Sequence, residues 1–151
     1  MTEAQQAESP AAFPPGQGMR VPSAIYEAMV AHALNDAPDE CCGIIASRDG
    51  QAVELFAMEN IAHSPLRYEM DTMELYQVMS GIDDAGLEPG IIYHSHTRTA
   101  PYPSQTDINL AFYPDSLYVI IGVAAASGKE PLVRAFTIRD QQVNEVPLTV
   151  A

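Results

Sequence analysis

Two histidines two residues apart, His94 and His96, close an apolar run and place strict demands on the fold. Residues 90–93 before them are typical of a strand, and side chains at positions i and i+2 of a strand point to the same face. Both imidazoles can therefore reach one metal ion. Asp107, three residues after Ser104, would have to return to that face from a new element. Two imidazoles and one carboxylate match the three protein ligands of many catalytic zinc sites, which leave a fourth position for water.

The segment from Ser104 to Asp107 also fits a second interpretation. Serine at the N-cap of a helix and an acid at the third helical position form a capping box. In that case Asp107 turns back toward the start of its own helix and does not meet the histidines. His94 and His96 would then be a pair of hydrogen-bonded strand residues. The residues alone leave both interpretations open, and Ser104 can cap a helix in either case.

With Glu40 in the segment 39–43, this pattern resembles the JAMM (MPN-plus) metallopeptidase family. The similarity extends from about Arg20 to about Val146 and is greatest to the stand-alone bacterial branch. A second stretch that is similar to this branch contains Asn60, Ser64, Pro65, Tyr68 and Asp71. The resemblance implies one α/β domain with a cytidine-deaminase-like mixed β-sheet flanked by helices.

The resemblance also implies the roles of individual residues. His94, His96 and Asp107 would bind one Zn²⁺ per chain, so no expected ligand is missing, in contrast to metal-free MPN domains that act only as scaffolds. Glu40 would move the proton between water and the leaving amine, and Ser104 would donate a hydrogen bond to the oxyanion. Ser95 and Thr97 point to the other face of the strand, where we expect them to support the ligands or to pack as ordinary strand residues.

The implied reaction is hydrolysis of the bond that follows the Gly-Gly tail of a ubiquitin-like protein. Within the bacterial branch this means release of a C-terminal cysteine from a sulfur-carrier protein in cysteine biosynthesis. A deubiquitinase-like isopeptidase is the alternative, but the loop 97–103 leaves no room for the long insertions of linkage-specific deubiquitinases. A non-catalytic binding module would leave the complete ligand set unused. An iron oxygenase with two histidines and one carboxylate would leave Glu40 and Ser104 without a role.

Composition bounds the partners and the compartment. The net charge of −13 repels phosphate backbones, so we expect no nucleic-acid partner.

Cys41 and Cys42 are adjacent and form no disulfide framework, which favours a reduced, cytoplasmic protein. We interpret Cys42 as a small buried residue, because the nearby carboxylate of Glu40 would raise the pKa of a thiol nucleophile. No signal peptide is visible and the longest apolar stretch, residues 118–126, is too short to span a bilayer. The sequence leaves the oligomeric state open.

Local patterns predict a disordered tail at residues 1–18, followed by a single domain at 19–151, although Met19 could itself be the true start. Helices are predicted at about 23–35, 71–84 and 104–112 from apolar periodicity and capping residues. Asp49-Gly50 predicts a hairpin turn between strands at 42–47 and 52–58. Further strands are predicted at 90–96, 117–123, 132–139 and 143–150. Strands interleaved with helices favour a mixed sheet with helices packed on it.

Overall fold

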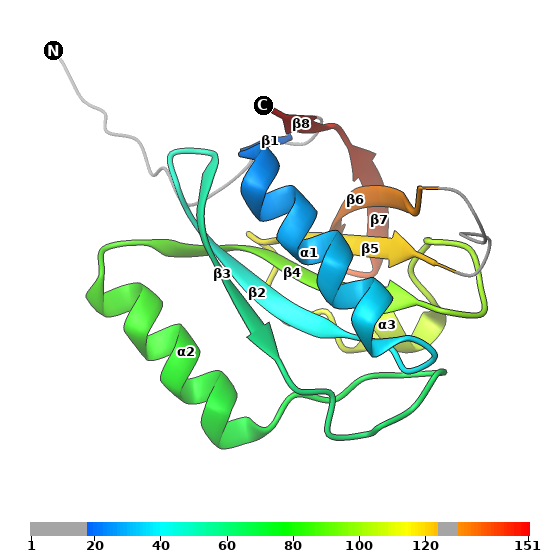
Figure 1. Ribbon diagram of the computed structural model, residues 1–151. Coiled ribbons are helices and arrows are strands. Elements are labelled where there is room, and N and C mark those ends of the chain that lie inside the picture. Colours follow the sequence, from blue (N-terminus) through cyan, green and yellow to red (C-terminus); the bar gives the residue numbers. More distant parts are fainter. Residues whose placement is uncertain (1–17, 124–129) are drawn as a thin grey trace, which may run out of the picture.

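One mixed sheet organises residues 18–123 and 130–151, the part of the chain that this computed structural model describes (Figure 1). The strand order is β7-β6-β5-β4-β2-β3-β1-β8. The pairs β4–β5, β1–β3 and β1–β8 are parallel, and the other neighbours are antiparallel. The strands are β1 (Met19–Val21), β2 (Cys42–Arg48), β3 (Gln51–Met58), β4 (Glu88–His96), β5 (Leu117–Gly122), β6 (Leu132–Arg139), β7 (Gln142–Val146) and β8 (Leu148–Val150). The predicted mixed α/β fold class is confirmed.

Helices cover both faces of the sheet. On one face lies α1 (Ser23–Asp36), whose Met29 and Ala33 are fully buried against the strands, as the spacing of its apolar residues predicts. On the other face lie α2 (Thr72–Asp84) and the short α3 (Gln105–Asn109). Among the described residues, no helix combines the length and apolar character needed to cross a membrane.

Local signals in the sequence set several boundaries. Asp49 and Gly50 both have positive φ values, 51° and 77°, as a two-residue hairpin turn between β2 and β3 requires. Asp71 caps α2, because its Oδ2 accepts a hydrogen bond from the Glu74 N–H at 3.0 Å. Gly86, at φ 73°, follows the end of the helix in the left-handed region. The predicted hairpin turn and the predicted helix at about 71–84 are confirmed.

Two predicted elements need correction. Helix α3 ends at Asn109 rather than near 112, because the Ala111 N–H donates to the Ile108 carbonyl, three residues back, and so departs from the four-residue helical pattern. The strand predicted at 143–150 is interrupted at Pro147, which has no N–H to donate. The short strand β1 was not predicted. The predicted tail, apart from residue 18, lies outside the described residues, as does the end of the apolar stretch beyond 123.

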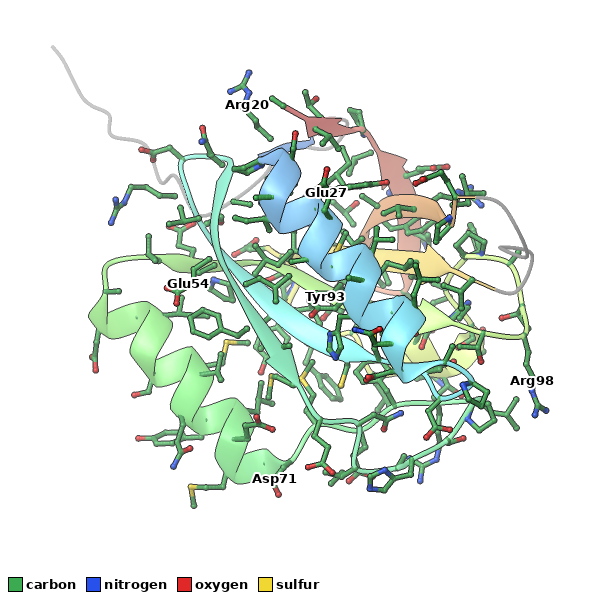
Figure 2. The ribbon with its side chains drawn as sticks, viewed as in Figure 1. Arg20, Glu27, Glu54, Asp71, Tyr93 and Arg98 are labelled. Carbon is green, nitrogen blue, oxygen red and sulfur yellow. The ribbon has the colours of Figure 1, made fainter. Side chains whose placement is uncertain are left out.

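The sheet is curled around α1. Pro147 alone separates β7 from β8, yet these two strands pair at opposite edges of the strand order, so the two edges must approach one another at this point. Val21 of β1 and Val146 of β7 accordingly share one buried cluster with the residues of α1. Tyr93 of β4 lies beneath α1 in Figure 2, and its hydroxyl is 2.7 Å from His32 Nδ1. The opposite face of β4 carries His94 and His96.

Candidate metal centre

Three side chains converge where β4 ends and α3 begins. His94 and His96 are buried on the face of β4 that carries Ile92, and Asp107 reaches them from the first turn of α3. The two Nε2 atoms are 3.1 Å apart. Asp107 Oδ2 is 3.2 Å from His94 Nε2 and 3.1 Å from His96 Nε2. The expected approach of Asp107 to both imidazoles is therefore found.

The capping box is also present, and it uses the same carboxylate oxygen. Ser104 Oγ accepts a hydrogen bond from the Asp107 N–H at 3.0 Å, and Asp107 Oδ2 accepts one from the Ser104 N–H at 2.9 Å. The capping box therefore exists, but it does not turn Asp107 away from the histidines as that interpretation expected. The cap holds the Asp107 carboxylate in place while its Oδ2 faces the histidines.

The donor atoms of the cluster fit a tetrahedral metal ion. Ligand atoms about 2.0–2.1 Å from a tetrahedral zinc ion lie about 3.3–3.4 Å from one another. The observed separations of 3.1–3.2 Å are close to that edge length. His96 Nδ1 lies 2.8 Å from the Ala100 carbonyl, which can only accept, so this nitrogen carries the proton and Nε2 presents its lone pair to the cluster. His94, His96 and Asp107 could therefore hold a metal ion.

The electrostatics of the cluster favour a cation. Burial raises the pKa of Asp107, but the hydrogen bonds from His94 and His96 lower it more, and the net pKa lies well below its usual range. Burial lowers the pKa of His96, whereas its hydrogen bonds to Asp107 and Ala100 raise it, and the net pKa is raised. Asp107 is therefore an anion that attracts positive charge, either a proton on His96 or a metal ion.

Glu40 lies two residues before the neighbouring strand β2, at the height of His96. The antiparallel register pairs Cys42 with His94, and the Cys41 carbonyl accepts from the Ser95 N–H at 3.1 Å, so Glu40 comes opposite His96. Glu40 is 5% exposed. Burial raises its pKa to about 7, an effect that His96 opposes and Asp107 reinforces. A carboxyl group with that pKa can both accept and release a proton near neutral pH.

Hydrogen bonds fix the backbone around Glu40 from several sides. The Glu40 N–H donates to the Ser64 carbonyl at 2.9 Å, and the Glu40 carbonyl accepts from Asn60 Nδ2 at 2.9 Å. Ser95 Oγ accepts from the Cys41 N–H at 2.8 Å. Thr97 Oγ1 donates to the carbonyl of Pro38 at 2.8 Å. Ser95 and Thr97, for which the sequence left supporting and ordinary roles open, therefore hold the segment that carries Glu40.

Sequence reasoning missed the functions of Asn60 and Tyr68. Both belong to a stretch that resembles the family, but no spacing rule assigned them a role. Asn60 is buried and its amide bonds to backbone groups on both sides of Tyr68. The Tyr68 ring stacks on the imidazole of His94, with 4.6 Å between ring centroids and 29° between planes. An asparagine and an aromatic residue in a loop carry no sequence signal for such long-range contacts.

The two cysteines take no part in the cluster. Cys41 and Cys42 are both free thiols and fully buried. Burial raises the pKa of each to about 12, which leaves almost no thiolate near neutral pH. The interpretation of Cys42 as a packing residue agrees with this environment.

An apolar pocket of about 210 Å³ opens beside the cluster, with Ser104 and Asp107 in its wall. Its other walls come from the loop between β3 and α2, from α2 and from the segment after α3. Its lining includes the apolar or aromatic residues Leu66, Tyr68, Met70, Leu75, Met79, Leu110, Phe112 and Tyr118. Leu66 and Phe112 are 69% and 71% exposed, so the rim of the pocket is also apolar. A peptide segment can therefore be bound next to the histidines.

Fold and cluster together define an α/β domain with a His-His-Asp group able to hold a metal ion at the end of a central strand. Residues 22–139 match the family model of prokaryotic homologs of the JAB domain, and the chain belongs to this family. The resemblance to JAMM proteins that the motif indicates is thereby confirmed.

Two relatives that match most of the chain carry peptidase or protease names. The chain is 40% identical over 128 residues to the CysO-cysteine peptidase of Mycobacterium tuberculosis, which covers 83% of this chain and 86% of that protein. It is 33% identical over 136 residues to a probable TtuB-protein conjugate cleaving protease of Thermus thermophilus, with coverage of 89% and 84%.

Solved structures share the fold. A protein from Desulfitobacterium hafniense superposes with a TM-score of 0.77 at 28% identity, covering 88% of this chain and 92% of its own. A JAB1/MPN domain protein from Archaeoglobus fulgidus has a TM-score of 0.60 at 17% identity, with coverage of 90% and 100%, and supports the fold alone.

Proposed function

We propose that this protein is a zinc-dependent peptidase that hydrolyses the bond after the C-terminal Gly-Gly of a ubiquitin-like protein. The bond we favour is the one that joins a C-terminal cysteine to a sulfur-carrier protein. The single observation that carries the proposal is the convergence of His94, His96 and Asp107 within 3.2 Å of one another, with Glu40 just before the neighbouring strand β2. The names of the relatives, which act on ubiquitin-like proteins or their conjugates, support the choice of substrate.

The proposed metal ligands are His94, His96 and Asp107, with one Zn²⁺ per chain. Zinc bound in such a site supplies an acidified water, with a pKa of about 7, and polarises a carbonyl group. The cluster lies open toward the pocket through Asp107, so a substrate carbonyl can approach from that side.

Glu40 is the proposed proton carrier. Hydrolysis of an amide requires one group that takes a proton from the attacking water and then delivers it to the leaving amine. A carboxyl group whose pKa is raised to about 7 exchanges protons readily at neutral pH. The hydrogen bonds from Asn60 and to Ser64 hold its backbone in place, so the side chain needs little reorganisation during the reaction.

Ser104 is the proposed donor to the oxyanion. Its Oγ uses a lone pair to accept from the Asp107 N–H, and the hydroxyl proton stays available for a second partner. Ser104 is exposed to the pocket, where the carbonyl oxygen of a bound substrate would lie. Capping and oxyanion stabilisation are therefore compatible roles for one hydroxyl group.

The pocket supports an extended peptide as substrate. A Gly-Gly tail is narrow and can pass the cluster without side-chain clashes, and an apolar side chain that precedes it can occupy the space lined by Leu75, Met79 and Tyr118. The body of the ubiquitin-like protein would then rest on the exposed apolar rim formed by Leu66 and Phe112.

Intact-mass analysis tests the function directly. The purified protein is mixed with sulfur-carrier proteins that end in Gly-Gly-Cys, and with the same carriers joined through their Gly-Gly to a lysine side chain. We expect loss of the single cysteine residue, dependence on added zinc, and no reaction for His94→Ala. Faster release of the lysine conjugate would instead support the isopeptidase, the activity that the name of the Thermus thermophilus relative suggests. No cleavage of either substrate by zinc-loaded protein would refute both.

A further inference from the structure

The two imidazoles of the cluster are anchored differently. His96 Nδ1 donates to the Ala100 carbonyl at 2.8 Å, which fixes the orientation of the ring. His94 is also buried, but its Nδ1 has no hydrogen-bond partner among the described residues. Histidines that bind metals almost always donate their second ring N–H to a partner that orients them. No hydrogen bond at Nδ1 from the described residues therefore orients the His94 ring.

Tyr68 contacts the His94 ring. Its ring lies on the face of the His94 imidazole, with centroids 4.6 Å apart and planes inclined by 29°. Stacked aromatic rings attract one another beyond the area they bury, and they restrict rotation of both rings. In the described part of the chain the Tyr68 hydroxyl makes no hydrogen bond, so the ring and not the hydroxyl group provides the interaction.

Asn60 holds the loop that presents Tyr68. Its Nδ2 donates to the carbonyl of Arg67 at 3.0 Å, and its Oδ1 accepts from the N–H of Glu69 at 3.0 Å. The same amide binds the Glu40 carbonyl and the Ala62 N–H, both at 2.9 Å, so all its hydrogen-bonding groups are used. The backbone on both sides of Tyr68 is therefore fixed to the segment that carries Glu40.

We propose that Tyr68 is a positioning residue that orients His94 for metal binding by stacking, in place of the hydrogen bond that His94 Nδ1 lacks. The inference rests on the proposed function only in assigning zinc to the cluster. Tyr68 also lines the apolar pocket, so one ring contacts both the bound peptide segment and a metal ligand. A peptide that packs on Tyr68 would thereby restrain His94, and zinc would in turn restrain the pocket wall, because coupling between two sites is reciprocal.

Zinc affinity of the full chain tests this proposal without reference to catalysis. The dissociation constant for zinc is measured by competition with a chromogenic chelator, at a temperature where circular dichroism reports each variant as folded. We expect Tyr68→Ala to bind zinc about 10-fold more weakly, at the lower end of the 10–100-fold losses typical for partners of metal ligands. Tyr68→Phe, which keeps the ring, should restore the affinity of the unmodified protein.

Leu75→Ala is the matched control. Leu75 packs in the same apolar cluster as Tyr68 and lines the same pocket, but it is an aliphatic residue of α2 without a ring to stack on His94. We expect this variant to lose stability and to keep its zinc affinity. Unchanged affinity in Tyr68→Ala, equal weakening in Tyr68→Phe, or equal weakening in Leu75→Ala would each overturn the role of the stack. An unmodified protein that binds no zinc would refute the proposed function instead.

Discussion

Replacing Glu40 by glutamine should stabilise the metal-free protein while it abolishes activity. Glutamine has nearly the same shape but stays neutral, whereas the buried Glu40 carboxyl must ionise against its surroundings as the pH rises. In the unfolded chain the ordinary pKa of 4.5 applies, and in the folded protein burial raises the pKa to about 7. The difference between these two pKa values, at 1.36 kcal/mol per pKa unit, corresponds to a loss of about 3 kcal/mol in the free energy of unfolding when Glu40 is ionised.

The sign of the effect follows from proton linkage. A carboxyl group with a raised folded-state pKa binds protons more tightly in the folded protein, so its ionisation costs stability. The cost is absent below pH 4.5, grows between pH 4.5 and about 7, and is constant above that range. Glu40→Gln should therefore match the unmodified protein at pH 4 and exceed its free energy of unfolding by up to about 3 kcal/mol at pH 8. Bound zinc favours the anion and should reduce this gain.

Urea denaturation in the presence of a chelator, followed by circular dichroism at several pH values, measures the difference. Glu27→Gln is the control, because Glu27 is exposed on α1 (Figure 2) and its replacement should change stability by less than about 0.5 kcal/mol. Equal stability of Glu40→Gln and the unmodified protein at pH 8 would refute the reasoning. A gain of the same size at pH 4 would also refute it, because it would arise from packing and not from ionisation.

Three further changes test other parts of the centre. Ser104→Ala should keep zinc, measured by elemental analysis, while kcat falls about 10²–10³-fold; an unchanged kcat would leave Ser104 with only its capping role. In the metal-free protein, the Asp107–His96 pair should contribute most to stability between pH 3.8 and pH 6.5, the ordinary pKa values of the two groups. The lowered pKa of Asp107 adds stability above pH 3.8, and the raised pKa of His96 adds stability below pH 6.5. Asp107→Asn should abolish that maximum in urea titrations, and a maximum that persists would place its origin elsewhere. Asn60→Ala removes four hydrogen bonds of a buried amide and should cost at least about 2 kcal/mol in the free energy of unfolding. A loss below about 0.5 kcal/mol, as at an ordinary surface site, would contradict the role of Asn60 in holding the loop.

Much of the centre follows from short-range patterns. The same-face placement of His94 and His96 depends only on the two-residue repeat of a strand. The position of Asp107 depends on a capping box that its own tetrapeptide encodes. The hairpin at Asp49-Gly50 likewise follows from residues that tolerate positive φ. Each of these features is set by neighbours within four residues, which is why it is visible before folding.

The unpredicted features are long-range contacts. The Ser95 hydroxyl meets the Cys41 N–H across 54 residues, and Thr97 meets Pro38 across 59. Asn60 and Tyr68 act through a loop whose path depends on the whole sheet. The break at Pro147 could be anticipated from its missing N–H, but the new partner of β8 could not, because parallel pairing with β1 requires the two ends of the domain to meet.

Residues 142–151 therefore connect the two edges of the sheet. Pro147 alone separates β7, which pairs with β6 at one edge of the sheet, from β8, which pairs with β1 at the other edge. The Ala151 carbonyl accepts a hydrogen bond from the Ser23 N–H at the start of α1. Both margins of the sheet are consequently closed by one continuous segment of about ten residues. Detaching that segment would uncover two unpaired strand edges and the base of α1 in one event. We therefore expect the end of the sheet far from the histidines to open as one cooperative unit.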